Sequence, residues 1–126
     1  MKAIYLNVKE NQPPKVVEIE DSLDTFYKLI GCELIEIPMI KIGNRIYHLI
    51  CDESGLLKEN PITSVVNTTY QQLIVGNILL VSGDITDDGN LIGLNDEDIK
   101  IIYQNVIFCA DRLNPILKGH FVIKAN

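Results

Sequence analysis

The sequence predicts one α+β domain over residues 1–126, with a mostly antiparallel sheet, a short N-terminal helix and a longer C-terminal helix. Three observations carry this prediction. The chain has the length of one domain, and 47% of its residues are hydrophobic, which is enough to build a core. Apolar residues alternate with polar ones in several short segments, as in strands, and recur at helical spacing in two others.

The N-terminal segment predicts a hairpin followed by a helix. Apolar and polar residues alternate in "KAIYLNV" and in "KVVEIE", and the two prolines of the intervening "ENQPP" cannot donate to a strand ladder. In "SLDTFYKLIG", Ser22 is a natural N-cap, apolar residues follow at helical spacing, and Gly31 ends the helix.

Further strands are expected in the middle of the chain. The segments "ELIEIPMI" and "RIYHLIC" alternate and predict two strands that turn around Gly43-Asn44. The stretch "LLKENPITSVVNTTYQQLIVG" fits a loop or a short helical turn, followed by a strand or a sheet edge. The apolar "NILLVSGD" predicts a buried strand, "LIGL" a returning strand, and "GHFVIK" a final strand.

The segment "NDEDIKIIYQNVIFCADRLN" predicts the longer helix, from Asp96 to Asn114. Asn95 is its N-cap, acidic residues fill its first turn, and Pro115 blocks its continuation. One apolar stripe of this helix has the spacing for packing on the sheet. A second stripe consists of Ile101, Asn105, Phe108 and Arg112.

This second stripe has two interpretations. It is either a solvated helix face that carries a stray Phe, or a surface that meets a partner subunit or a ligand. Arg112 is one of only two arginines, and a guanidinium matches phosphate oxygens with two hydrogen bonds. Phe108 lies four residues earlier, so on a helix an adenine–phosphate ligand would meet both side chains.

The stretch "DITDDGNLIGLN", residues 84–95, superficially resembles a calcium-binding loop. An EF-hand loop requires a bidentate carboxylate at its twelfth position, and here that position is Asn95. The segment that enters the loop also has the composition of a strand, whereas an EF-hand loop follows a helix. The acidic residues are therefore interpreted as turn formers, and no metal is expected.

Composition excludes several classes of function. A net charge of −6 without a basic run disfavours binding to a nucleic acid polymer, and no apolar run of about 20 residues is available to span a membrane. No signal peptide is recognisable, and the three cysteines lie in apolar sequence, which fits reduced thiols in a cytosol. Known catalytic motifs are absent, so binding without turnover and without a cofactor is the expectation.

Three stretches of the chain resemble one known family. The opening "MKAIYLNV…PKVVEIEDSLDTFYKLIG", the middle "IEIPMI…IYHLICDESGLL" and the end "IVGNILLVSGD…LNDEDI" resemble, in this order, the family described as domain of unknown function 3846, over about residues 1–100. That family is common in phages and mobile elements of Gram-positive bacteria. Among such sequences, the chain resembles the first type of phage Thoeris anti-defence proteins.

The resemblance implies a function. Such proteins are not enzymes; in the host cytoplasm they sequester cyclic ADP-ribose isomers made by TIR-domain sensors. They form homodimers or larger oligomers with the ligand near the subunit interface, and some members bind cyclic oligonucleotides at a separate site. The family's Asn–Arg ligand pair aligns with Asn95 and Arg112, and its aromatic contact aligns with Ile85. Because Ile85 is not aromatic, Phe108, on the same predicted helical face as Arg112, is the candidate for the aromatic contact.

Two alternatives belong to other classes. In the first, the chain is an interaction protein of a mobile element that binds a host protein and no small molecule. In the second, it is a hydrolase of the same cyclic signal.

Overall fold

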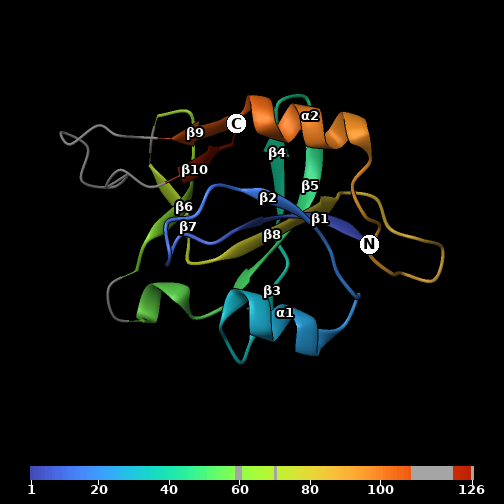
Figure 1. The fold of residues 1–126 in the computed structure, drawn as a ribbon, viewed down its shortest axis with the longest axis horizontal. Coiled ribbons are helices and arrows are strands. Elements are labelled where there is room, and N and C mark those ends of the chain that lie inside the picture. Colours follow the sequence, from blue (N-terminus) through green and yellow to red (C-terminus); the bar gives the residue numbers. More distant parts are fainter. Residues whose placement is uncertain (59–60, 70, 109–120, 126) are drawn as a thin grey trace.

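The computed structural model describes residues 1–58, 61–69, 71–108 and 121–125, and it arranges them as two sheets and two helices (Figure 1). The larger sheet is antiparallel throughout and has the strand order β2-β1-β8-β5-β3, with β4 also paired to β5. Its strands are β1 (Lys2–Leu6), β2 (Lys15–Glu18), β3 (Ile35–Glu36), β4 (Met39–Ile42), β5 (Arg45–Asp52) and β8 (Ile78–Ser82).

The smaller sheet has the order β7-β6-β10-β9, and only its β10–β6 pair is parallel. Its strands are β6 (Thr63–Val66), β7 (Gln72–Val75), β9 (Val106–Phe108) and β10 (Phe121–Lys124). The helices are α1 (Leu23–Ile30) and α2 (Asp96–Gln104), and a short 3₁₀ turn, η1, spans Gly55–Leu57. The predicted α+β class with a mostly antiparallel sheet and two helices is confirmed.

The ends of α1 are those the sequence predicts. The Ser22 hydroxyl accepts a hydrogen bond from the Thr25 N–H, which satisfies one of the free donors of the first turn. Gly31 has a φ of 77°, and its N–H donates to the Tyr27 carbonyl at 2.8 Å. This left-handed conformation strains any residue with a Cβ atom, so glycine ends the helix here.

The core lies on both faces of the larger sheet. Strand β8 is buried along its whole length, and its side chains alternate between two clusters. Leu79 and Val81 pack on the side of α1 with Phe26, whereas Leu80 packs on the side of α2 with Ile102. Helices α1 and α2 therefore cover opposite faces of the sheet (Figure 1), and the predicted buried strand is confirmed.

The longer helix ends earlier than expected. Helix α2 stops at Gln104, and Val106–Phe108 forms β9, which pairs with β10. The side-chain amide of Asn105 donates to the Ile101 carbonyl at 2.8 Å, so a side chain takes the acceptor that continued helix would use. The β-branched residues that follow favour a strand. The predicted helix is thus wrong at residues 106–108, and its remainder, 109–114, lies outside the described residues.

The acidic stretch after β8 is a turn, as predicted. The Thr86 N–H donates to the Asn90 carbonyl at 2.9 Å, and the Gly89 N–H donates to the Thr86 carbonyl at 2.9 Å. Gly89 has a φ of 81°, which suits glycine at a tight turn. The expected returning strand is reduced to one isolated bridge between Ile85 and Leu91. Across the described ranges, no helix is long and apolar enough to cross a bilayer.

Candidate functional site

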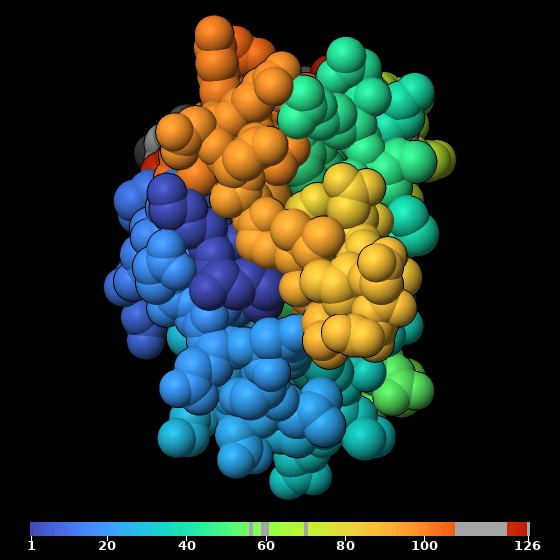
Figure 2. Space-filling view, turned by 90° about the vertical axis from the view of Figure 1, so that its right-hand side faces the viewer, coloured from blue at the N-terminus to red at the C-terminus, as the bar shows by residue number. Residues whose placement is uncertain are grey.

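An open hollow of about 630 Å³ lies where three segments meet: the N-terminus of α2, the β4–β5 hairpin, and the loop of residues 83–93 that follows β8. Figure 2 shows these segments on one face, with α2 in orange, the hairpin in green and the loop in yellow. This volume is within the range of small-molecule sites. Its polar lining comprises Asn44, Arg45, Ser82, Asp84, Asn95 and Asp98.

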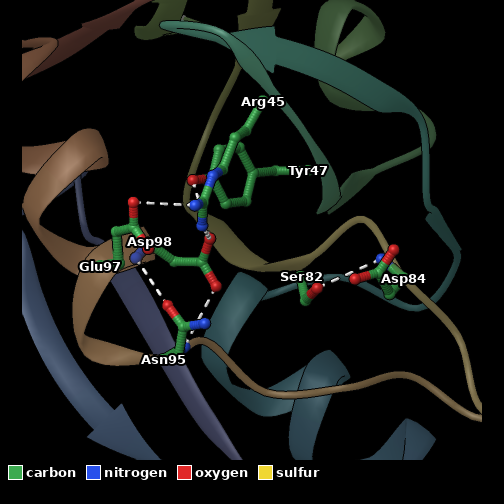
Figure 3. A network of polar contacts seen from close by, with 7 residues as sticks. All are labelled: Arg45, Tyr47, Ser82, Asp84, Asn95, Glu97 and Asp98. Carbon is green, nitrogen blue, oxygen red and sulfur yellow. Dashed lines mark hydrogen bonds and ion pairs between the residues drawn. The ribbon is translucent and has the colours of Figure 1, made fainter.

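Arg45 is the cation of this hollow. One terminal nitrogen of its guanidinium, Nη1, donates to Asp98 Oδ1 at 3.0 Å, and the other, Nη2, lies 2.9 Å from Glu97 Oε1 (Figure 3). These contacts, first the hydrogen bond to Asp98 and then that to Glu97, raise the pKa of Arg45 above its ordinary value. The first residue of β5 is thereby tied to the first turn of α2.

Asp98 is the fixed centre of the network in Figure 3. Besides Arg45, its Oδ1 accepts the Tyr47 hydroxyl at 3.1 Å, and its Oδ2 accepts the Asn95 N–H at 3.1 Å. The Asn95 side chain accepts the Asp98 N–H at 2.8 Å in return, which completes a capping box. Burial first, and then the hydrogen bond to Asp98, raise the pKa of Tyr47 to about 12.

Two glycines allow the loop of residues 83–93 to lie close against the sheet, because they have no Cβ atom. A Cβ atom on Gly83 would lie 2.2 Å from the Ile46 carbonyl oxygen, and one on Gly93 would lie 2.7 Å from the Lys2 nitrogen. Neither position accepts a side chain without a backbone shift, because both neighbours are main-chain atoms. Across Gly83, the Asp84 N–H donates to the Ser82 hydroxyl at 3.2 Å (Figure 3). The loop therefore forms a preformed wall of the hollow.

Large apolar side chains are exposed at the same place. Met39 and Ile46 line the hollow and are 57% and 53% exposed, and Ile92 lines it from the loop. Ile85, next to the lining residue Asp84, is 57% exposed. Exposed apolar residues gathered in one place mark interaction or ligand surfaces more often than scattered ones do. The hollow thus combines an apolar wall with a guanidinium, two amides and carboxylates.

The four residues singled out from the sequence are not brought together by the described part of the structure. Asn95 caps α2 and lines the hollow, and Ile85 lies in the neighbouring loop. Phe108 is in β9, so the helical face that would have joined it to Arg112 does not exist. Arg112 itself lies outside the described residues.

Sequence reasoning missed Arg45 and Tyr47 as members of this site. Arg45 is the first of the two arginines in the chain, but its partner Asp98 is 53 positions away. Only the pairing of β4 with β5 and the position of α2 across that hairpin join them. The acidic first turn of α2 was no signal for Arg45, since a helix N-terminus by itself favours acidic residues.

A second hollow, of about 650 Å³, lies at the C-terminal end of α1. Lys58 Nζ lies 2.5 Å from the buried carboxylate of Asp52 and donates to the Gly31 carbonyl at 3.5 Å. Lys9 Nζ donates to the Ile30 carbonyl at 3.4 Å. These ammonium groups satisfy the last carbonyls of α1, where positive charge is favourable. The positions of the two lysine side chains are thus explained by their role in capping the C-terminal end of α1.

The fold and the first hollow together define a small α+β protein with a preformed, partly apolar surface site rimmed by one arginine. The chain belongs to the family described as domain of unknown function (DUF3846), whose sequence model matches residues 1–107. No curated protein and no solved structure matches the chain significantly. The family match includes all three segments that build the hollow, and it ends before Arg112.

Proposed function

We propose that this protein binds a cyclic ADP-ribose isomer and holds it without cleaving it. In this proposal it is a phage anti-defence protein that acts in the host cytoplasm and withdraws the signal of TIR-domain Thoeris immunity. The observation that carries the proposal is the hollow beside α2, whose size and mixed lining suit a nucleotide. The sequence resemblance supplies the identity of the ligand.

The lining offers a partner for each part of such a ligand. Arg45 is the group for a phosphate, because a guanidinium forms charge-assisted hydrogen bonds with phosphate oxygens. The Asp84 carboxylate accepts hydrogen bonds from hydroxyl groups and so suits a ribose. Met39 and Ile46 present the apolar surface on which an adenine ring would lie.

The four residues proposed from the sequence keep defined roles. Asn95 would use its amide N–H groups, because its side-chain oxygen already accepts the Asp98 N–H. Ile85 would add apolar contact from the loop. Arg112 and Phe108 are proposed as a further phosphate contact and a further ring contact, contributed from the C-terminal part of the chain.

Assembly as a homodimer or larger oligomer is part of the proposal. The exposed apolar side chains around the hollow support it, because a second subunit would shield them from water. For the same reason, we propose that the ligand lies close to a subunit interface. The resemblance also implies, for some members, a separate site for cyclic oligonucleotides. The same binding assay with a cyclic oligonucleotide tests whether this chain has one.

A retention experiment tests the function. The purified protein is mixed with cyclic ADP-ribose, freed of excess ligand, and denatured by heat, after which the released material is analysed by chromatography. Intact ligand at a stoichiometric amount supports sequestration. A converted product, in the released material or in the removed excess, identifies a hydrolase instead, and the absence of both retained ligand and converted product contradicts both functions.

A second candidate function has one observation in its favour. The same exposed apolar residues, Met39, Ile46 and Ile85, would also suit a protein partner. A host protein that binds this surface in place of a nucleotide would protect the three side chains from solvent, whereas cyclic ADP-ribose would not be retained.

A further inference from the structure

We propose that Glu97, which lies beside the hollow and not in its lining, is an exchangeable partner of Arg45 that a ligand phosphate displaces, and that Glu97 thereby lowers the affinity of Arg45 for anionic ligands. This inference rests on the proposed function and deepens it. It starts from an asymmetry between the two carboxylates that contact Arg45. The Glu97 side chain is 67% exposed, whereas that of Asp98 is 10% exposed.

Moving Asp98 away from Arg45 would be energetically unfavourable. Its two oxygens accept hydrogen bonds from Arg45, Tyr47 and the Asn95 N–H, and it is buried. If it moved, the Tyr47 hydroxyl would lose its acceptor inside the protein, and a buried polar group without a partner is unfavourable. Asp98 therefore acts as a positioning residue: it keeps Nη1 of Arg45 occupied and fixes the plane of the guanidinium.

Glu97 has no such ties. In the part of the chain that the structure describes, the only partner of its carboxylate is Arg45 Nη2, at 2.9 Å. An ion pair exposed to water contributes little, because solvent screens it and ordering two long side chains costs entropy. When Glu97 swings away, its charge enters water and no unpaired group is buried.

The exchange affects the binding of anionic ligands alone. A phosphate oxygen can take the place of Glu97 Oε1 on Nη2, because both are anionic acceptors for a charge-assisted hydrogen bond. A neutral nucleoside offers no anionic oxygen and leaves the Arg45–Glu97 pair closed. The Arg45–Glu97 pair therefore lowers the affinity of phosphate-bearing ligands by the strength of one exposed ion pair and leaves the affinity of neutral ligands unchanged.

Asp96 provides a matched control. It precedes Glu97 in the same first turn and carries the same charge, but its carboxylate lies 3.8 Å from Lys2 Nζ and is 97% exposed. Glu97→Gln and Asp96→Asn each remove one negative charge from the α2 N-terminus. Only the first variant breaks a contact with Arg45, so the difference between them isolates that contact from general electrostatics.

The test titrates the full-length wild type and both variants with cyclic ADP-ribose, inorganic pyrophosphate and adenosine by calorimetry. Glu97→Gln should bind cyclic ADP-ribose and pyrophosphate about three- to five-fold more tightly than the wild type, the effect of removing one exposed ion pair. Asp96→Asn should gain less than about two-fold, since it removes only a screened charge. The affinity for adenosine should not change.

The outcomes separate this inference from the proposed function. Equal gains in both variants, or no gain in Glu97→Gln, overturn the exchange even where the wild type retains cyclic ADP-ribose. If the wild type retains no cyclic ADP-ribose, but Glu97→Gln binds pyrophosphate more tightly than Asp96→Asn does, the proposed function is wrong and the exchange holds. No pyrophosphate binding by any of the three proteins overturns the exchange as well.

Discussion

The hydrogen bond between Tyr47 and Asp98 gives the sharpest test of the structure. Asp98→Ala removes the acceptor of a buried hydroxyl and one half of the α2 capping box. A buried hydroxyl without a partner costs about 1–3 kcal/mol, and loss of a capping interaction costs about 1 kcal/mol. We therefore expect Asp98→Ala to lower the free energy of unfolding by about 2–4 kcal/mol.

Tyr47→Phe should cost much less. It removes the donor and leaves Asp98 with Arg45 and the Asn95 N–H, so we expect a loss of about 0.5–1.5 kcal/mol, the net value of one hydrogen bond. In the double variant the unpaired hydroxyl is gone. The two effects should therefore not add, and the double variant should be no less stable than Asp98→Ala alone.

Urea denaturation of the four proteins measures this cycle. Thermal unfolding gives a second reading, because 1 kcal/mol corresponds to a shift in melting temperature of about 4 °C for a domain of this length. Asp98→Ala should then melt roughly 8–16 °C below the wild type. Strict additivity of the two single variants would refute the contact between Tyr47 and Asp98, and an undisturbed Asp98→Ala variant would refute the burial of the whole network.

Four further predictions follow from the site and the sequence. Arg112→Ala should weaken binding of cyclic ADP-ribose about ten-fold or more, with partial rescue by Arg112→Lys, while its melting temperature hardly changes; calorimetry with unchanged affinity would contradict this role. A calcium titration should leave the melting temperature unaltered, since Asn95 stands where a calcium loop needs a carboxylate. Light scattering at micromolar concentration should give a dimer or larger, and a monomer of 14.2 kDa would count against it. Because the pKa of Tyr47 rises from 10.0 to about 12 on folding, the unfolded chain loses this proton first, and stability should fall from pH 10 toward pH 12, less steeply in Tyr47→Phe.

Local signals in the sequence were sufficient to predict most of the helices, strands and turns. Ser22 and Gly31 mark the two ends of α1 because their effects act within one helical turn. Gly43 and Asn44 form the two-residue turn between β4 and β5, where Ile42 pairs with Arg45. The separation into two sheets could not be predicted, because the parallel pairing of β10 with β6 joins segments about 60 residues apart, and no local pattern specifies such a partner.

The end of α2 shows how two local signals compete. Residues 105–108 keep the helical apolar spacing, but they also include two β-branched residues and an Asn that bonds back to Ile101. Sheet pairing with β10 decides the outcome in favour of the strand, and that pairing is a tertiary effect which overrides helical propensity.

The same tertiary effect relocates the candidate site. A helix through residue 112 would have placed Phe108 and Arg112 on one face, with the phosphate far from the acidic N-terminus of α2. Because β9 removes that face, the cation that lines the hollow together with the capping residue Asn95 is Arg45, which the β4–β5 hairpin places at the first turn of α2. The acidic residues there, which from the sequence alone argue against a phosphate, include the two partners of Arg45. One of these, Asp98, fixes the guanidinium, and the other, Glu97, is exposed enough to yield its place to an anionic ligand.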